Sequence, residues 1–159
     1  ILTAEDDQGD PLIARIPTEG TTVDVEDVLA LWASLPAKYR KDATFVCNSA
    51  MEAILRTLQD GNGQYLMVHN LTEGLGATLL GRPLVIAEEF PGDLDAGDDA
   101  LMVGDFSRAV YIADKAGIDI QRNDAAGFYS DITAFRAIMR TDIALALPEA
   151  LKVLSIKDS

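Results

Sequence analysis

Apolar residues at helical spacing mark the first clear element of the chain. Between Asp24 and Pro36 they recur every three or four residues, which predicts a helix with one apolar face. The positions on this face are Val25, Val28, Leu29, Trp32 and Leu35. Thr22 or Asp24 can cap the start of the helix, and Pro36 ends it.

A strand and a second helix follow this element. Residues 44–47 form a β-prone run, and Asn48 or Ser49 can cap a helix whose apolar face continues to Leu58. The DGNG sequence at 60–63 ends that helix. The basic segment 38–41 is expected to be a solvated loop, with a partner-facing patch as the alternative.

Short strands account for much of the remaining apolar sequence. Residues 84–87 follow a turn that ends at Pro83, residues 100–103 follow an acidic loop, and residues 149–156 form a last strand. Residues 1–21 have no regular period and contain Gly and Pro clusters. We expect residues 1–21 to be an exposed lead-in.

Residues 104–122 combine a loop, two strand patterns and a turn candidate. The run 109–113 is β-prone, the sequence KAG at 115–117 favours a turn, and residues 118–121 alternate between apolar and polar side chains. This pattern predicts a β-hairpin. Residues 123–127, which are rich in Asn, Asp and Gly, are expected to form the next loop.

Residues 128–146 alternate with a period of two over an unusual length. Phe135, Ala137 and Met139 lie on one predicted face, and Arg136 and Arg140 lie on the other. A single strand of this length would span more than about 50 Å, which favours an elongated subunit that forms assemblies. A helix over 134–147 is the competing interpretation, but it would scatter the charged residues among apolar positions.

Composition limits the class of protein. The net charge of −13 argues against electrostatic binding of nucleic acid, because phosphates are held by clustered cations. The longest apolar run is shorter than the ~18 residues that a membrane span needs, and the first residues do not resemble a signal peptide. We therefore expect a soluble globular protein. The absence of Met before Ile1 favours a fragment.

No constellation of catalytic or metal-binding residues is recognisable. Cys47 is the only cysteine and is expected to be a buried hydrophobe, and His69 is the only histidine. The acidic segment 93–98 faintly resembles a calcium loop but has Gly104 where the closing glutamate belongs. The Gly-rich segment 60–63 follows a helix, whereas a phosphate loop precedes one. We predict no catalytic, cofactor or metal site.

Four segments in the same order resemble the major capsid proteins of tailed phages, which have the Hong Kong ninety-seven-like fold. The segments are residues 31–66, 79–91, 104–122 and 147–156. The resemblance implies an α+β fold with an axial domain at residues 22–106, to which the strand 149–157 returns. It also implies a partial peripheral domain at residues 107–147. The family's N-terminal arm, extended loop and spine helix would be absent.

The same resemblance implies a function in assembly rather than catalysis. The chain would be a structural subunit of a phage or prophage icosahedral capsid, forming pentamers and hexamers that enclose packaged DNA. Its partners would be other copies of itself and head proteins such as the portal, the scaffold or the maturation protease. It would assemble in the cytoplasm of a bacterial host and reside in the virion capsid, with no specific nucleic-acid recognition and no membrane partner.

Two alternatives and one set of contact residues complete these expectations. The first alternative is an encapsulin-type nanocompartment shell, which shares the fold, and the remote one is a small α/β ligand-binding protein or enzyme. Arginines near the predicted hairpin and on the long strand are the candidates for inter-subunit contacts in an otherwise acidic chain. They are Arg108, Arg122, Arg136 and Arg140.

Overall fold

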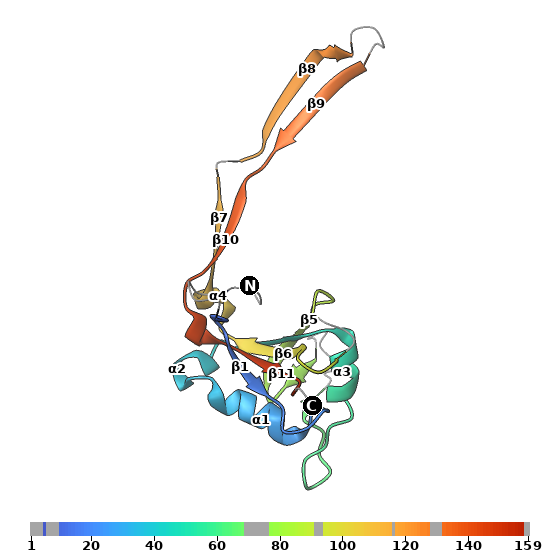
Figure 1. Cartoon of the computed structure of the whole chain (residues 1–159), viewed down its shortest axis with the longest axis vertical. Helices are drawn as coiled ribbons and strands as arrows, with labels where there is room; N and C mark the ends of the chain where they lie inside the picture. Colours follow the sequence, from blue (N-terminus) through green and yellow to red (C-terminus); the bar gives the residue numbers. More distant parts are fainter. Residues whose placement is uncertain are drawn as a thin grey trace. The chain divides into compact units, whose positions relative to one another are not determined.

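A mixed seven-stranded sheet, in the order β1-β11-β6-β2-β5-β4-β3, organises the larger of two units (Figure 1). The structure is a computed structural model that describes residue 5 and residues 10–68, 77–90, 94–115, 117–127 and 132–157. Unit 1 comprises Ile1–Ala109 and Leu145–Ser159, and unit 2 comprises Val110–Ala144. The combination of helices with this mixed sheet confirms the α+β class.

The centre of the sheet forms the core of unit 1. Strand β6 (Asp99–Gly104) is buried at all six positions, between β11 (Leu151–Ser155) and β2 (Thr44–Cys47), both of which run antiparallel to it. A strand covered on both faces is a continuous apolar run, as residues 100–103 are. The three strands predicted here are confirmed, although residues 148–150 form the short helix η1 (Pro148–Ala150) before β11.

Helix α1 (Val25–Ser34) begins with a capping box. Asp27 accepts the backbone N–H of Asp24 at 2.9 Å, and Asp24 in turn caps the first turn of the helix. The ring of Trp32 stacks on Phe45 of β2 with centroids 5.7 Å apart, which packs α1 against that face of the sheet.

The prediction of the buried face of α1 was wrong at two positions. Leu29 is 45% exposed, whereas Leu31, which the spacing left out, is fully buried together with Val28 and Leu35. These buried residues follow a single stripe at intervals of three and four, and Leu29 lies about 100° away from Val28.

Helix α3 (Ser49–Leu55) follows β2 directly, as predicted, but it ends at Leu55 and does not continue through Leu58 to the DGNG sequence at 60–63. Its N-cap is Asn48, which accepts the N–H of Met51 at 2.7 Å. The chain then forms the sheet edge with β3 (Met67–Val68), β4 (Thr78–Leu79) and β5 (Arg82–Ile86). The predicted turn before β5 is present, with φ of 50° at Leu80 and 74° at Gly81, and β5 begins two residues earlier than expected.

Two segments predicted to be irregular are ordered parts of unit 1. The lead-in contains β1 (Ala14–Pro17), which pairs in parallel with β11. The residues that flank β1, Ile13 and Thr18, are both buried. The basic segment contains helix α2 (Ala37–Arg40), and its Tyr39 is buried. Both predictions missed long-range contacts, because the C-terminal residues Ser155 and Glu149 hold Thr18 and Tyr39.

Unit 2 contradicts the predicted hairpin. After the short helix α4 (Phe106–Ala109) the chain forms β7 (Val110–Asp114) and β8 (Asp119–Gly127). Strand β7 pairs with β10 (Thr141–Leu145), and β8 pairs with β9 (Ile132–Ile138). The two strands that were expected to pair with each other therefore continue in succession, and each pairs with part of the returning chain (Figure 1).

Two further predictions in unit 2 were wrong in their boundaries. The loop expected at residues 123–127 is the end of β8, where the register with β9 shifts between Asn123 and Gly127. The long single strand is divided into β9 and β10 by Met139 and Arg140. The competing helix over residues 134–147 does not form.

Candidate assembly surface

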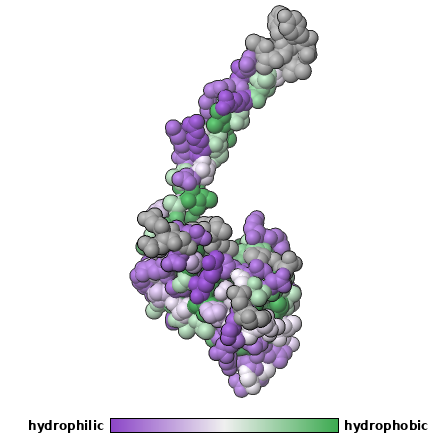
Figure 2. Space-filling view, viewed as in Figure 1, coloured by the Kyte–Doolittle hydropathy of each residue, from purple (hydrophilic) through white to green (hydrophobic). Residues whose placement is uncertain are grey.

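Large apolar side chains of unit 2 are exposed to solvent. Ile120 and Phe135 are 68% and 69% exposed. Among the residues of this unit whose burial is described, the other large apolar ones with more than half of their surface exposed are Tyr111, Ile112, Ile118, Met139 and Ile143. Figure 2 shows the result as green apolar surface interleaved with purple polar surface along the ribbon.

The register of β8 and β9 separates these side chains by face. Ile120 lies opposite Ala137, and Arg122 lies opposite Phe135. Directly opposed residues share a face of an antiparallel pair, so these four residues form one face, here called the apolar face. The other face contains Gln121 opposite Arg136 and Asp119 opposite Ile138. The predicted alternation between Phe135 and Arg136 is therefore real within β9.

The described part of unit 2 consists of two-stranded ladders with no second layer packed on them. A two-stranded ribbon is marginally stable by itself in water, and a contiguous exposed apolar patch marks a surface that another molecule covers. Burying one Ile or Phe side chain contributes about 1.5–3 kcal/mol. The apolar face can therefore supply much of the free energy of association with a partner.

Of the four predicted contact arginines, Arg108 is engaged within its own chain. Its Nε lies 3.2 Å from Oδ2 of Asp105, a carboxylate that is 1% exposed and stands immediately before α4. Oδ1 of Asp105 accepts the hydroxyl of Ser107 at 2.6 Å, whereas Oδ2 makes no hydrogen bond. The contact is thus a charge pair without hydrogen-bond geometry, and Arg108 balances a buried negative charge.

The other three predicted arginines lie in unit 2 and do not form one cluster. Arg122 and Arg136 project from opposite faces of the β8–β9 ladder, and Arg140 lies between β9 and β10. All three are exposed. Their role in contacts between subunits stays a prediction.

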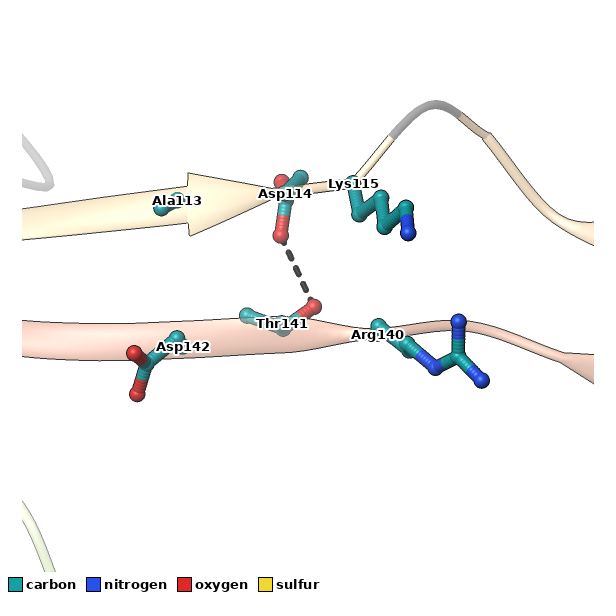
Figure 3. Close-up of a pocket in the computed structure, with 6 residues that line it drawn as sticks. All are labelled: Ala113, Asp114, Lys115, Arg140, Thr141 and Asp142. Atoms are coloured by element: carbon teal, nitrogen blue, oxygen red, sulfur yellow. Dashed lines mark hydrogen bonds between the residues drawn. The ribbon is translucent and has the colours of Figure 1, made fainter.

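The junction between the two ladders brings Arg140 together with a residue that the sequence did not single out. Lys115 donates its backbone N–H to the carbonyl of Arg140 at 3.0 Å. Both residues line a shallow hollow of about 310 Å³ with Ala113, Asp114, Thr141 and Asp142 (Figure 3). Lys115 was placed in the turn of a hairpin, so its pairing with the distant Arg140 was not foreseeable.

A change of register at this junction explains the misplaced turn. Three residues separate Lys115 from Asp119, whereas one residue separates Ile138 from Arg140, and the pairs Lys115–Arg140 and Asp119–Ile138 flank this difference. Gly117 has a φ of 68°, a left-handed conformation that glycine adopts without strain. The glycine thus accommodates extra residues in one strand and does not reverse the chain.

The described residues offer little that could support catalysis. Burial raises the pKa of the Cys47 thiol to about 12, so the group stays protonated and unreactive near neutral pH. No group of three metal-ligating side chains occurs within the described ranges. His69 and Asp93, the first residue of the supposed calcium loop, lie outside them.

An acidic hollow of about 370 Å³ lies at the start of α1, lined by Glu19, Asp24, Val25, Glu26 and Asp27. Asp27 uses both carboxylate oxygens on backbone N–H groups, those of Glu19 at 3.0 Å and Asp24 at 2.9 Å. Its charge therefore organises the helix start. No helix among the described residues is long and apolar enough to cross a membrane.

Solved structures resemble this chain over nearly its whole length. The capsid of the empty GTA particle is 27% identical with a TM-score of 0.76, and the match covers 94% of this chain and 51% of that one. Gordonia phage Cozz matches at 13% identity and a TM-score of 0.58, covering 93% of this chain and 51% of that one. The SrpI encapsulin complex of Synechococcus elongatus matches at 15% identity and 0.57, covering 94% and 57%.

These likenesses differ in what they show. At 13% and 15% identity, the Gordonia phage and encapsulin structures share the fold alone. The chain spans about half the length of each of these solved chains. No curated protein sequence matches it. The sequence matches the phage capsid family over residues 3–156, and with this architecture the chain belongs to that family and has the Hong Kong ninety-seven-like capsid fold.

Proposed function

We propose that the chain acts as a structural subunit of a phage or prophage capsid, self-assembling into pentamers and hexamers that enclose packaged DNA. The observation that carries the proposal is the exposed apolar face of the β8–β9 ladder, in a chain of the phage capsid family. Heterologous contacts between copies close into rings around symmetry axes. Such contacts would cover surface that the single chain leaves in water.

The two units fit different places in such a shell. We assign unit 1, with its seven-stranded sheet, to the axial domain around the symmetry axes of the capsomers. Unit 2 corresponds to the described part of the peripheral domain. The proposed role is structural rather than catalytic, in keeping with the family and with the inert Cys47.

The other proposed partners follow from this role. A capsid subunit assembles in the cytoplasm of its bacterial host and meets a portal, a scaffold or a maturation protease before it reaches the virion. The net charge of −13 supports a shell that does not hold nucleic acid by clustered cations.

Electron microscopy tests the proposal directly. The protein is expressed at the full length of its gene with its neighbouring head genes, and closed icosahedral shells that contain DNA are expected. An absence of closed shells would contradict the proposal. The encapsulin-type alternative, which the fold shared with SrpI supports, predicts closed shells that enclose a cargo protein and form without a portal.

A further inference from the structure

The junction of the two ladders in unit 2 places two cations on one side of the ribbon. Lys115 and Arg140 are joined by their backbone hydrogen bond of 3.0 Å. Besides the hollow of Figure 3, both line a second one of about 220 Å³ with Gly117, Asp119 and Ile138. In Figure 3 their side chains extend in the same direction along the ribbon.

Neither cation forms an ion pair within the described residues, although Asp114, Asp119 and Asp142 line the same two hollows. The four ion pairs found there involve other cations, namely Arg15, Lys38, Arg56 and Arg108. Of the nearby acids, Asp114 accepts the hydroxyl of Thr141 at 2.8 Å, and Asp119 accepts the side-chain amide of Gln121 at 3.1 Å. The carboxylate of Asp142 points away from the Arg140 guanidinium in Figure 3.

Like charges on neighbouring strands repel each other. An anion between them reverses the sign of this interaction, because the ammonium and the guanidinium can both donate hydrogen bonds to it. Lys115 and Arg140 thus place two hydrogen-bond donors beside shallow hollows, and neither donor is in an ion pair within the described residues.

We propose that Lys115 and Arg140 form a carboxylate-binding site that is filled by an acidic side chain of a second copy of this chain. The excess of carboxylates in unit 1 supports this occupant. Unit 1 contains 21 Asp or Glu against nine Lys or Arg, whereas unit 2 contains five against four. The inference rests on the proposed assembly function and specifies one of its contacts.

Zero-length cross-linking tests the site. Full-length protein is assembled from a mixture of unlabelled and ¹⁵N-labelled copies, and the particles are treated with a carbodiimide, which couples an amine to a carboxylate without a spacer. Peptide mass spectrometry is expected to find Lys115 joined to an Asp or Glu of a copy with the other label. A bound carboxylate should also slow the chemical acetylation of Lys115. Acetylation of Lys115 at equal rates in particles and in free subunits would therefore overturn the inference. Protection of Lys115 from acetylation in DNA-filled particles but not in empty ones would also overturn it, because the site would then bind phosphates of the DNA.

Charge reversal provides the second arm. The Lys115→Glu and Arg140→Glu double variant is expected to lower the yield of particles about tenfold or more, since a loss of ~1.4 kcal/mol per contact already gives this factor. The matched control reverses Lys41 and Lys157, which take no part in the four ion pairs of the described residues, and keeps a normal yield. Thermal melting of the free subunit verifies that both double variants fold.

The assembly function and the carboxylate site can be refuted separately. If the unchanged protein forms no particles, the proposed function is wrong. If it forms particles and the Lys115 and Arg140 double variant assembles equally well, the assembly function stands and the carboxylate site is wrong.

Discussion

Gly104 at the end of β6 lies so close to Ala150 that a Cβ on Gly104 would overlap the carbonyl oxygen of Ala150 and lie 2.7 Å from Cδ2 of Leu151. Gly104 and Leu151 are also directly paired across the β6–β11 ladder. Only glycine therefore permits the last strand to join the core at this point.

A methyl group at this position should destabilise unit 1. We expect Gly104→Ala to lower the free energy of unfolding by about 1–3 kcal/mol, because backbone atoms must shift to relieve the overlap. Denaturant titration measures the change. Gly61→Ala is the matched control, since a Cβ there meets nothing within 4 Å, and equal stability of the two variants would contradict the expectation.

Because Arg108 pairs with Asp105 of its own chain, its removal should affect the stability of the free subunit. Arg108→Ala should lower the stability of the free subunit by about 1–2 kcal/mol, because the buried carboxylate of Asp105 loses its compensating charge. Thermal unfolding of the unassembled protein provides the measurement. Arg136→Ala serves as the control, since Arg136 is exposed on β9 and takes no part in the four ion pairs of the described residues.

The apolar face of the β8–β9 ladder makes a separate prediction. Phe135→Asp should reduce the yield of closed shells about tenfold or more while the subunit stays folded, because burying the ring contributes ~1.5–3 kcal/mol to each contact. Sedimentation and electron microscopy measure the yield. Gln121→Asp, on the opposite face, should assemble normally, and an equal loss in both variants would show that the two faces do not differ.

The contact between α2 and η1 predicts a dependence on pH. Glu149 accepts Lys38 Nζ at 2.8 Å and the Tyr39 hydroxyl at 2.5 Å, and these hydrogen bonds, that of Lys38 first, lower the pKa of Glu149 below its ordinary value of 4.5. The stability that they contribute is complete above that value and is lost as the pH falls through the lowered pKa.

Thermal melting of the original protein and of Glu149→Gln from neutral to acidic pH tests this assignment. The original protein should melt at a higher temperature at pH values above 4.5, and the difference should vanish in stronger acid. The difference should be small, since the Lys38 and Glu149 side chains are 59% and 56% exposed. A difference that stays constant over the whole range would refute it.

The sequence predicted most of unit 1 because its elements are defined locally. The cap at Asp24, the run before Asn48 and the apolar residues 100–103 each determine an element through nearby side chains. Two of the segments that it missed, β1 and α2, depend on residues more than 100 positions away, as in the hydrogen bond from Tyr39 to Glu149. Periodicity within a window contains no information about such contacts.

In unit 2 the local pattern identified strands but not their partners. Glycine at 117 has the left-handed φ that a turn requires, and a tight turn and a change of register look alike in sequence. Of the candidate surface, Arg140 and the alternation around Phe135 were predictable. Lys115 was not, because its significance comes from lying beside a residue 25 positions away.

The number of residues in the antiparallel ladders of unit 2 determines both the position of the contact residues along the ribbon and the face on which they lie. Each residue adds about 3.3 Å along a strand, and side chains alternate between faces. Inserting one residue in both β8 and β9 would therefore turn everything beyond it, Phe135 or Arg122 included, to the opposite side. Inserting two in each would preserve the sides and displace the contact by about 7 Å. Within this design, the reach of the ribbon is adjustable only in steps of two residues in each strand.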